Sequence, residues 1–290
     1  MAADVGVIGA GIVGLATAYA VLERGASVAV YERGVPGQGQ SGGESRIFRH
    51  LHDDPRLAAF ARDSRGLWAA WSERLGATLV SPDGAVALGP AAQRRLRALD
   101  GVDGLAVRPI DRDELRARLP LLAEFGGPAV LDERGGSIRT SAAIALLRSA
   151  IGDALVADEV LAVRPTRSGT VEVRAGGVRA EHARVVVCAG RGTAALAAGA
   201  GLELPLRQGA HVRLTYELRD RPPSVLACLQ DGSGEFGETG VYAAAEPGNG
   251  RYAVGLSASV DAAGDGGVAD PAALADLAAR ATAYVRRALP

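Results

Sequence analysis

Residues 4–14 of the chain, Asp-Val-Gly-Val-Ile-Gly-Ala-Gly-Ile-Val-Gly, decide the fold. A short apolar strand leads into glycines at positions 9, 11 and 14, which match the pattern G-x-G-x-x-G, and a helix rich in Ala and Leu follows. Residues 26–31 then alternate like a second strand that ends at Glu32. A glycine turn between a strand and a helix, with an acidic residue closing the next strand, is typical of a β-α-β unit that binds a dinucleotide.

Each position of the glycine turn has a physical role. Gly9 allows the tight turn out of the strand, and Gly11, without a Cβ, lets the backbone approach a pyrophosphate. Gly14 lets the helix pack closely on the sheet. Ile12 and Val13 lie at the helix N-terminus, where unpaired N–H groups and a positive partial charge favour phosphate. We therefore expect these five residues to contact the cofactor.

The acidic end of the second strand indicates which nucleotide binds. Glu32 is expected to accept hydrogen bonds from the adenosine ribose hydroxyls, with Arg33 beside it, and its charge disfavours the 2′-phosphate of NADP. An NAD dehydrogenase would continue with regular βαβ units. Here a loop rich in Gly, Gln and Ser over residues 34–43 and an arginine-rich segment over residues 45–50 follow instead. The pattern favours FAD.

Composition excludes several classes of function. The net charge of −1 gives no argument for nucleic acid or an anionic membrane, and no apolar run is long enough to span a bilayer. All basic residues are arginines, which excludes a Schiff-base lysine and a P-loop lysine. Cys188 and Cys228 lie in no metal-ligand spacing, so we expect no metal and a reducing, cytoplasmic environment.

The order of strand and helix patterns along the chain predicts an α/β protein with two discontinuous domains. Strands alternate with helices in residues 1–80 and 135–205, which predicts a Rossmann-like FAD-binding domain. Residues 81–134 and 206–290 show short and then long alternating strands with covering helices, which predicts a substrate domain built on a mixed or antiparallel sheet. Residues 34–52 are expected to form a loop before a helix over residues 55–75.

Several stretches together resemble a known family. They are residues 9–14, Glu32, and residues 44–50, 135–139, 185–190, 205–208, 241–242 and 252–257. The chain resembles the FAD-dependent amine oxidoreductases, the superfamily of D-amino-acid oxidase, glycine oxidase and, most of all, monomeric sarcosine oxidase. The most specific stretch is residues 44–50, Glu-Ser-Arg-Ile-Phe-Arg-His. The resemblance implies an FAD-binding domain of the GR2 type.

The resemblance also implies further cofactor contacts. Ser45 and Arg46 would lie near the flavin, with Arg46 close to the isoalloxazine ring. Val160 would contact adenine through its backbone, and the small residues Ala189 and Gly190 would allow close approach to the cofactor.

The implied activity is that of an amine or amino-acid oxidase. The C–N bond of a small amine or N-substituted amino acid would be oxidised to an imine, with O2 accepting the electrons to give H2O2. The residues expected at the reacting centre are Arg46, Arg49, His50 and Tyr242. Arg139 and Arg213 are candidates for pairing with a substrate carboxylate, and His211 for lining the pocket. For each of these side chains a structural or solvated role is the alternative.

Two departures from the family leave alternatives open. The lysine that sarcosine oxidases place over the flavin would fall at Ala253, which puts fast lysine-assisted reduction of O2 in doubt. The chain also ends before a segment that the relatives carry, and neither cysteine lies where sarcosine oxidases bond the flavin covalently. The alternative is therefore an FAD-binding fragment, or a subunit that needs a second chain to complete the flavin site.

A second alternative is an FAD-dependent aromatic hydroxylase. That class shares the N-terminal glycine motif and carries a Gly-Asp phosphate motif in its second half. Asp231-Gly232 and Asp265-Gly266 are the nearest pairs here, and both lie in predicted loops without the required strand context.

Overall fold

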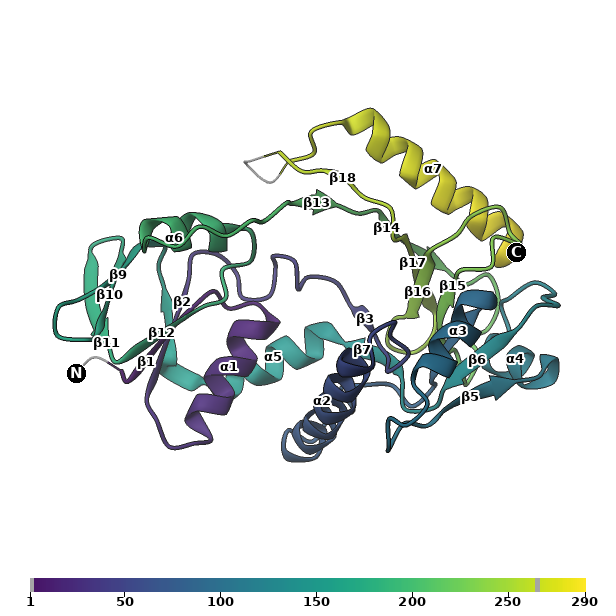
Figure 1. Cartoon of the computed structure of the whole chain (residues 1–290), viewed down its shortest axis with the longest axis horizontal. Coiled ribbons are helices and arrows are strands. Elements are labelled where there is room, and N and C mark those ends of the chain that lie inside the picture. The colour runs from purple at the N-terminus through teal and green to yellow at the C-terminus, as the bar shows by residue number, and fades with distance from the viewer. Residues whose placement is uncertain (1–2, 264–266) are drawn as a thin grey trace. The chain divides into compact units, whose positions relative to one another are not determined.

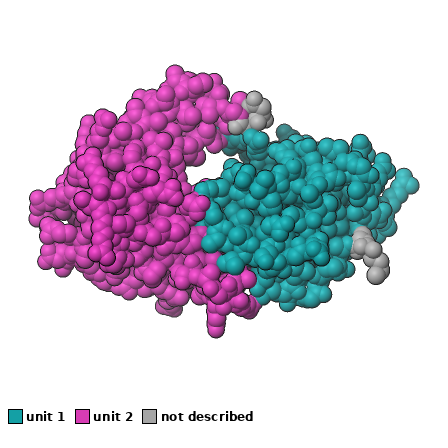
Figure 2. Space-filling view, turned by 180° about the vertical axis from the view of Figure 1, so that it is seen from behind, with its two compact units in different colours: residues 1–43, 140–208 teal, residues 44–139, 209–290 magenta. Residues whose placement is uncertain are grey.

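The computed structural model describes residues 3–263 and 267–290, and the chain forms two compact units (Figure 1, Figure 2). Unit 1 comprises Met1–Gly43 and Thr140–Gln208, and unit 2 comprises Glu44–Arg139 and Gly209–Pro290. Each unit is thus built from two separate stretches of the chain. Compared with the boundaries expected from the sequence, residues 44–80 and 135–139 lie in unit 2, and residues 206–208 lie in unit 1.

Unit 1 contains the predicted β-α-β unit. Strand β1 (Val5–Ile8) pairs in parallel with β2 (Val28–Glu32), and helix α1 (Ile12–Leu22) connects them. Two further parallel strands, β8 (Leu155–Ala157) and β12 (Arg184–Val187), complete a sheet in the order β12-β1-β2-β8. The sheet is therefore parallel, as the Rossmann-like prediction requires.

The rest of unit 1 supports this sheet. Helix α5 (Thr140–Ala150) packs beside α1. An antiparallel meander of β9, β10 and β11 buries Val173 and Ala175 against Tyr31 of β2. The remaining bounds are β9 (Val160–Pro165), β10 (Val171–Ala175), β11 (Val178–His182), α6 (Thr193–Gly199) and two 3₁₀ turns at Gly152–Ala154 and Gly190–Gly192.

Unit 2 is built on a seven-stranded sheet in the order β14-β17-β16-β15-β4-β6-β5. Only β15 and β4 pair in parallel, so the sheet is mixed, as predicted. Its strands are β14 (Arg213–Glu217), β17 (Arg251–Leu256), β16 (Val241–Ala245), β15 (Cys228–Asp231), β4 (Ala85–Leu88), β6 (Ala129–Asp132) and β5 (Val107–Ile110).

Helix α7 (Pro271–Ala288) covers one face of this sheet. It begins at the N-cap Asp270, whose side chain accepts a hydrogen bond from the backbone N–H of Ala273 at 3.0 Å. Its buried residues recur at helical spacing and form one apolar stripe: Leu277, Ala281, Tyr284 and Ala288. The buried Tyr284 hydroxyl donates to the Asp231 carboxylate at 2.9 Å, which ties the helix to β15.

A two-stranded ribbon corrects the prediction for residues 45–52. Strand β3 (Ser45–Phe48), expected to be part of a loop, pairs antiparallel with β7 (Gly136–Arg139). A strand exists only with a partner, and this partner lies far away in the sequence. The remaining elements of unit 2 are α2 (Pro55–Arg74), α3 (Pro90–Ala98), α4 (Arg112–Arg118), β13 (Gly209–Ala210) and β18 (Val260–Asp261).

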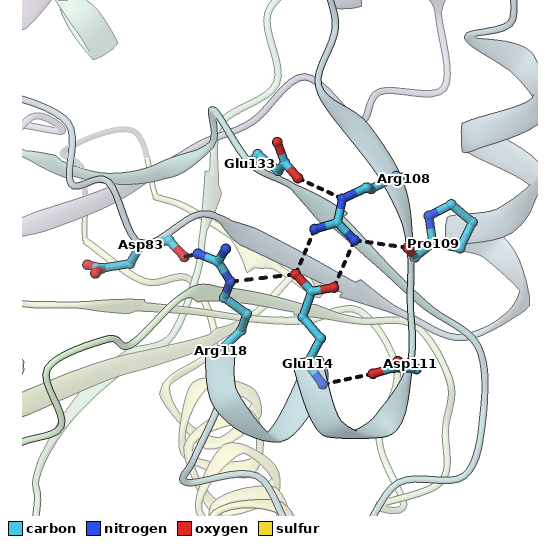
Figure 3. A network of polar contacts seen from close by, with 7 residues as sticks. All are labelled: Asp83, Arg108, Pro109, Asp111, Glu114, Arg118 and Glu133. Atoms are coloured by element: carbon cyan, nitrogen blue, oxygen red, sulfur yellow. Dashed lines mark hydrogen bonds and ion pairs between the residues drawn. The ribbon is translucent and has the colours of Figure 1, made fainter.

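A network of ion pairs attaches α4 to the edge of the sheet (Figure 3). Arg108 on β5 binds both carboxylate oxygens of Glu114, at 2.8 and 2.7 Å, and Glu133 at 2.6 Å. Glu114 also lies at the start of α4, where its N–H donates to Asp111 at 2.9 Å. Because the network is exposed to solvent, we assign it a role in orienting α4 rather than a large stabilising energy.

The buried contact between Tyr284 and Asp231 generates a prediction about stability. The Tyr284→Phe substitution should lower the free energy of unfolding by about 1–3 kcal/mol, because it leaves a buried carboxylate without one donor. Tyr216→Phe is the matched control, since its hydroxyl pairs with the neutral Thr282 at 3.0 Å and its loss should cost less. Denaturant titration measures both, and equal losses would contradict the assignment.

Candidate cofactor and substrate sites

The glycine turn of unit 1 is packed at distances that only glycine allows. Gly9 follows β1 with φ +99°, and a Cβ there would overlap the Cys188 carbonyl oxygen. A Cβ on Gly14 would overlap the Gly9 carbonyl oxygen. Gly11, the N-cap of α1, is more open, since its Cβ would meet only Ser41 Oγ, at 3.2 Å. The first turn of the helix therefore sits directly on the strand end.

The N-terminus of α1 is prepared for an anion. Gly11 provides no side-chain cap, and the Ile12 N–H donates to Ser41 Oγ at 3.0 Å. The Val13 side chain is 65% exposed beside it. The positive end of the helix dipole and a backbone free of side-chain bulk together suit a pyrophosphate.

Glu32 is fixed by the backbone at the end of β2. Its Oε2 accepts from the Ala10 N–H at 2.8 Å, and its Oε1 accepts from the Gly34 N–H at 2.9 Å. Each carboxylate oxygen retains a second lone pair, so the group can still accept from ribose hydroxyls. Arg33 instead forms an ion pair with Glu159 at 2.9 Å on the surface, next to Val160 at the start of β9.

The predicted residues after β12 lie at the same edge of the sheet. Ala189 and Gly190 follow Cys188, whose N–H donates to the Ile8 carbonyl at 2.7 Å. Gly190 has φ +54°, and a Cβ there would lie 3.2 Å from Gln40 Oε1. The glycine turn, the start of α1 and Gly190 therefore lie together at the carboxyl ends of neighbouring parallel strands. Ligands of such sheets bind at this edge.

In unit 2, the face of the sheet opposite α7 is covered in part by the β3–β7 ribbon. Ser137 Oγ donates to the Ala245 carbonyl at 2.7 Å, and Ser45 Oγ lies 3.5 Å from the Ala244 carbonyl. Ile47 packs against Cys228 and Ala244. Because residues in antiparallel register share a face, Arg139, opposite Ser45, points to the same side of the ribbon.

Three residues form a row across this face. Arg213 on β14 is in register with Gly255 on β17, which is in register with Tyr242 on β16. A Cβ on Gly255 would lie 2.5 Å from Tyr242 Cζ and 2.6 Å from Tyr242 Oη. The tyrosine ring therefore lies across Gly255, toward β14, and only glycine leaves room for it.

Guanidinium groups gather at Ser45. Arg213 donates to the Ser45 carbonyl at 2.6 Å and to Ser45 Oγ at 2.7 Å, and Arg46 donates to the same carbonyl at 2.8 Å. Burial lowers the pKa of Arg213, and the positive charge of Arg46 lowers it further. Arg213 Nε and Arg139 Nη1 are buried and have no hydrogen-bond partner among the described residues.

The other predicted polar residues have partners within the protein. Arg49 donates to the Leu51 carbonyl at 2.8 Å and to Gln230 Oε1 at 2.9 Å. His50 is 1% exposed, and its Nδ1 lies 3.0 Å from the buried Asp132 carboxylate. The exposed His211 lies 3.1 Å, through Nδ1, from the Ala258 carbonyl. Roles for these residues in the reaction remain predictions.

The structure also places the residues that concern the lysine of sarcosine oxidases and the phosphate motif of aromatic hydroxylases. Ala253, on the same face as Gly255, is 1% exposed and occupies the position at which the resemblance to sarcosine oxidases would place a lysine. Asp231, of the Asp231-Gly232 pair, is 1% exposed and holds Ser233 and Tyr284. Asp265-Gly266 lies outside the described residues.

Sequence inspection missed Gly255 and Gln230. An isolated glycine in a strand pattern is a signal of close approach by another group, so Gly255 could have been found. Gln230 gave no such signal, because its contact with Arg49 depends on the folded chain.

The sequence profile of DAO, the FAD-dependent oxidoreductases, matches residues 4–289. The chain belongs to this family. Its cofactor is accordingly FAD, as predicted from the sequence. A search of curated protein sequences finds no significant match. Among the described residues, no helix is both long and apolar enough to cross a bilayer.

Solved structures share the fold. L-proline dehydrogenase from P. horikoshii superposes with a TM-score of 0.83 at 18% identity, covering 100% of this chain and 77% of that one. Glycine oxidase from Geobacillus kaustophilus gives 0.77 at 21%, covering 99% and 80%. L-amino acid deaminase from Proteus myxofaciens gives 0.74 at 22%, covering 95% and 62%. These likenesses show the fold of this FAD-dependent oxidoreductase.

The geometry of unit 1 fits the ADP part of FAD. A Cβ at Gly9 or Gly14 would overlap backbone atoms, so these glycines let α1 begin directly against the strand end, and Gly11 adds no side chain at its N-terminus. Glu32 stands at the neighbouring strand end, where it would hold the ribose.

The Gly14 contact yields a prediction about cofactor affinity. Gly14→Ala should weaken FAD binding about tenfold or more, equivalent to about 1.4 kcal/mol, because the new Cβ forces α1 away from Gly9. Gly199→Ala is the matched control in unit 1, since no atom lies within 4 Å of its added Cβ. Titration of each apoprotein variant with FAD measures its affinity. Equal affinities for the two variants would contradict the role assigned to Gly14 in cofactor binding.

His52 yields a prediction about pH. Burial lowers its pKa from the ordinary 6.5, and the charge of Arg49 lowers it further. The unfolded chain therefore takes up a proton at higher pH than the folded chain, so stability should fall as pH drops below 6.5. His52→Gln, which removes the titrating ring, should flatten this fall. Denaturant midpoints between neutral and acidic pH test this, and an unchanged slope would disprove it.

Proposed function

We propose that this oxidoreductase converts the C–N bond of a small amino acid, or an N-substituted one, to an imine, with O2 accepting the electrons to give H2O2. The family supplies the redox cofactor. The observation that carries the substrate class is the pair of buried, unpartnered N–H groups on Arg139 and Arg213.

A buried N–H group without an acceptor is costly, and an anionic ligand that accepts from it removes that cost. Glu246 acts on the Arg213 charge and forms an ion pair with Arg251 at 2.9 Å, yet its Oε2 and the two arginine N–H groups all lack a hydrogen-bond partner among the described residues. An amino-acid carboxylate offers the acceptor that is lacking, and arginine binds carboxylates with favourable planar geometry. The proteins with similar structures are named for proline, glycine and L-amino acids, which supports the same class.

The chain's own residues have separable tasks in this proposal. Arg139 and Arg213 hold the substrate carboxylate, and the Tyr242 hydroxyl, held across Gly255, is available to hydrogen-bond the substrate. The positive charge of Arg46 stabilises negative charge that develops nearby. Bound FAD supplies the acceptor for the two electrons. Both cysteines are free thiols, which supports a cytoplasmic location.

The test is anaerobic reduction of the flavin. Holoprotein is mixed with D- and L-amino acids and their N-methyl derivatives, and the visible flavin absorbance is followed. We expect bleaching by members of this panel, then recovery with H2O2 formation when air is admitted. Bleaching that recovers only with an artificial dye would make the protein a dehydrogenase and overturn the assignment of O2. A flavin that no amine bleaches would overturn the proposed function itself.

A further inference from the structure

Ser45 binds one edge of the Arg213 guanidinium with two oxygen atoms, as a carboxylate would. Arg213 Nη1 donates to the Ser45 carbonyl at 2.6 Å, and Arg213 Nη2 donates to Ser45 Oγ at 2.7 Å. The five N–H groups of a guanidinium point in fixed directions within one plane. The two hydrogen bonds, which we call the Ser45 clamp, therefore set the direction of the whole group and leave the edge that carries Nε.

The nitrogen on that remaining edge has no partner. Arg213 Nε is buried and lacks a hydrogen-bond acceptor among the described residues. A buried N–H group without an acceptor costs free energy until an acceptor arrives. A carboxylate can accept from Nε and from the second N–H of Nη2 together, in the paired geometry that arginine favours. The edge that the clamp leaves is thus suited to the carboxylate of the proposed substrate.

Ser45 is itself held in place by the ribbon and the sheet. The residue is 0% exposed, and it lies opposite Arg139 in the antiparallel pairing of β3 with β7. Its Oγ also lies 3.5 Å from the Ala244 carbonyl of β16. Arginine, in contrast, has a long side chain with many rotamers. A guanidinium that nothing held would have to be ordered when the ligand binds, whereas the clamp orders Arg213 beforehand.

The hydroxyl is the part of the clamp that a side-chain substitution removes. The Ser45 carbonyl belongs to the backbone, and it accepts from Arg46 at 2.8 Å as well as from Arg213. The hydroxyl accepts from Arg213 Nη2. Without the hydroxyl, Nη2 loses this acceptor, and the Arg213 guanidinium can turn about the one hydrogen bond that remains to Ser45.

We propose that Ser45 is a positioning residue of the substrate site and acts through Arg213, holding the Nη edge so that the Nε edge receives the substrate carboxylate. This inference rests on the proposed function. It assigns the Ser45 hydroxyl to substrate binding, whereas the family resemblance implies a place near the flavin. Because a group that is fixed in advance loses less freedom on binding, the clamp raises the affinity for carboxylates.

The experiment measures carboxylate affinity in matched variants. Ser45→Ala removes the hydroxyl of the clamp. Ser137→Ala is the control, because it removes the other serine contact of the ribbon with β16, the 2.7 Å bond to the Ala245 carbonyl. Acetate and propionate are titrated into holoprotein by calorimetry. We expect Ser45→Ala to weaken both about tenfold, equivalent to about 1.4 kcal/mol, and Ser137→Ala to weaken them less than about threefold. Equal losses in the two variants would overturn the inference.

A double-substitution cycle tests whether Ser45 acts through Arg213. In the Arg213→Gln background, Ser45→Ala should cause no further loss of carboxylate affinity, because the group that it positions is already gone. Additive losses would mean that Ser45 acts on another group, such as the flavin, and would overturn the inference. The FAD affinity of Ser45→Ala apoprotein, titrated in parallel, should stay within about threefold of the wild-type value.

A lysine variant separates orientation from charge. Arg213→Lys retains the positive charge but has no planar edge for the clamp, so it should bind acetate about as weakly as Arg213→Gln does. Wild-type affinity in Arg213→Lys would show that charge alone suffices and would overturn the inference. This variant carries the test by itself if Ser45→Ala does not fold.

Turnover distinguishes this inference from the proposed function. With an amino acid that bleaches the flavin, Ser45→Ala should raise KM about tenfold and change kcat less than about threefold, because the carboxylate is remote from the bond that reacts. An unchanged KM would overturn the inference and leave the proposed function standing. Coupled carboxylate binding by Ser45 and Arg213, with a flavin that no amine bleaches, would support the clamp and count against the proposed function.

Discussion

The backbone carbonyl of Ser45 accepts hydrogen bonds from Arg213 and Arg46, two cations that would otherwise repel each other. This arrangement is possible because β3 pairs with β7 and the ribbon lies on the sheet through Ser45 and Ser137. The strand carbonyl offers a fixed partial negative charge, and the guanidinium groups orient around it. The geometry of the candidate substrate site depends on this single acceptor more than on any side-chain ion pair.

Unit 1 is organised by a different constraint, the absence of Cβ atoms at its strand–helix turn. The α1 helix can begin against the Gly9 carbonyl only because Gly14 has no side chain. Glu32 then closes the turn by accepting from Ala10, so an acidic residue on one strand stabilises the loop that leaves another. The candidate cofactor site is in this sense made from backbone, and the Glu32 side chain holds that backbone in place.

The sequence predicted the strands and the glycine turn of unit 1 well because their determinants are local. A strand, the spaced glycines and the acidic end of the next strand follow one another within residues 4–32. In the structure the two strands pair in parallel, as expected. The mixed sheet of unit 2 was also predictable from alternating strands. Residues 45–48 were not, because their strand requires a partner near residue 139 that no local pattern reveals. The contacts of Tyr242 with Gly255, and of His50 with Asp132, depend on register and tertiary packing in the same way.

The tyrosine that lies across Gly255 has a consequence for how such a site can diversify. Its ring lies against the backbone of β17 at Gly255, which has no side chain, so no substitution at that position can make more room beneath the ring. Even one methyl group at position 255 would displace the ring. In the proposed substrate site, a change in the size of the ligand accepted would then come from the ribbon and β14, which lie beside the tyrosine. The ribbon carries Arg139 and β14 carries Arg213, so in the proposed site a change in shape preference and a change in charge preference would be coupled.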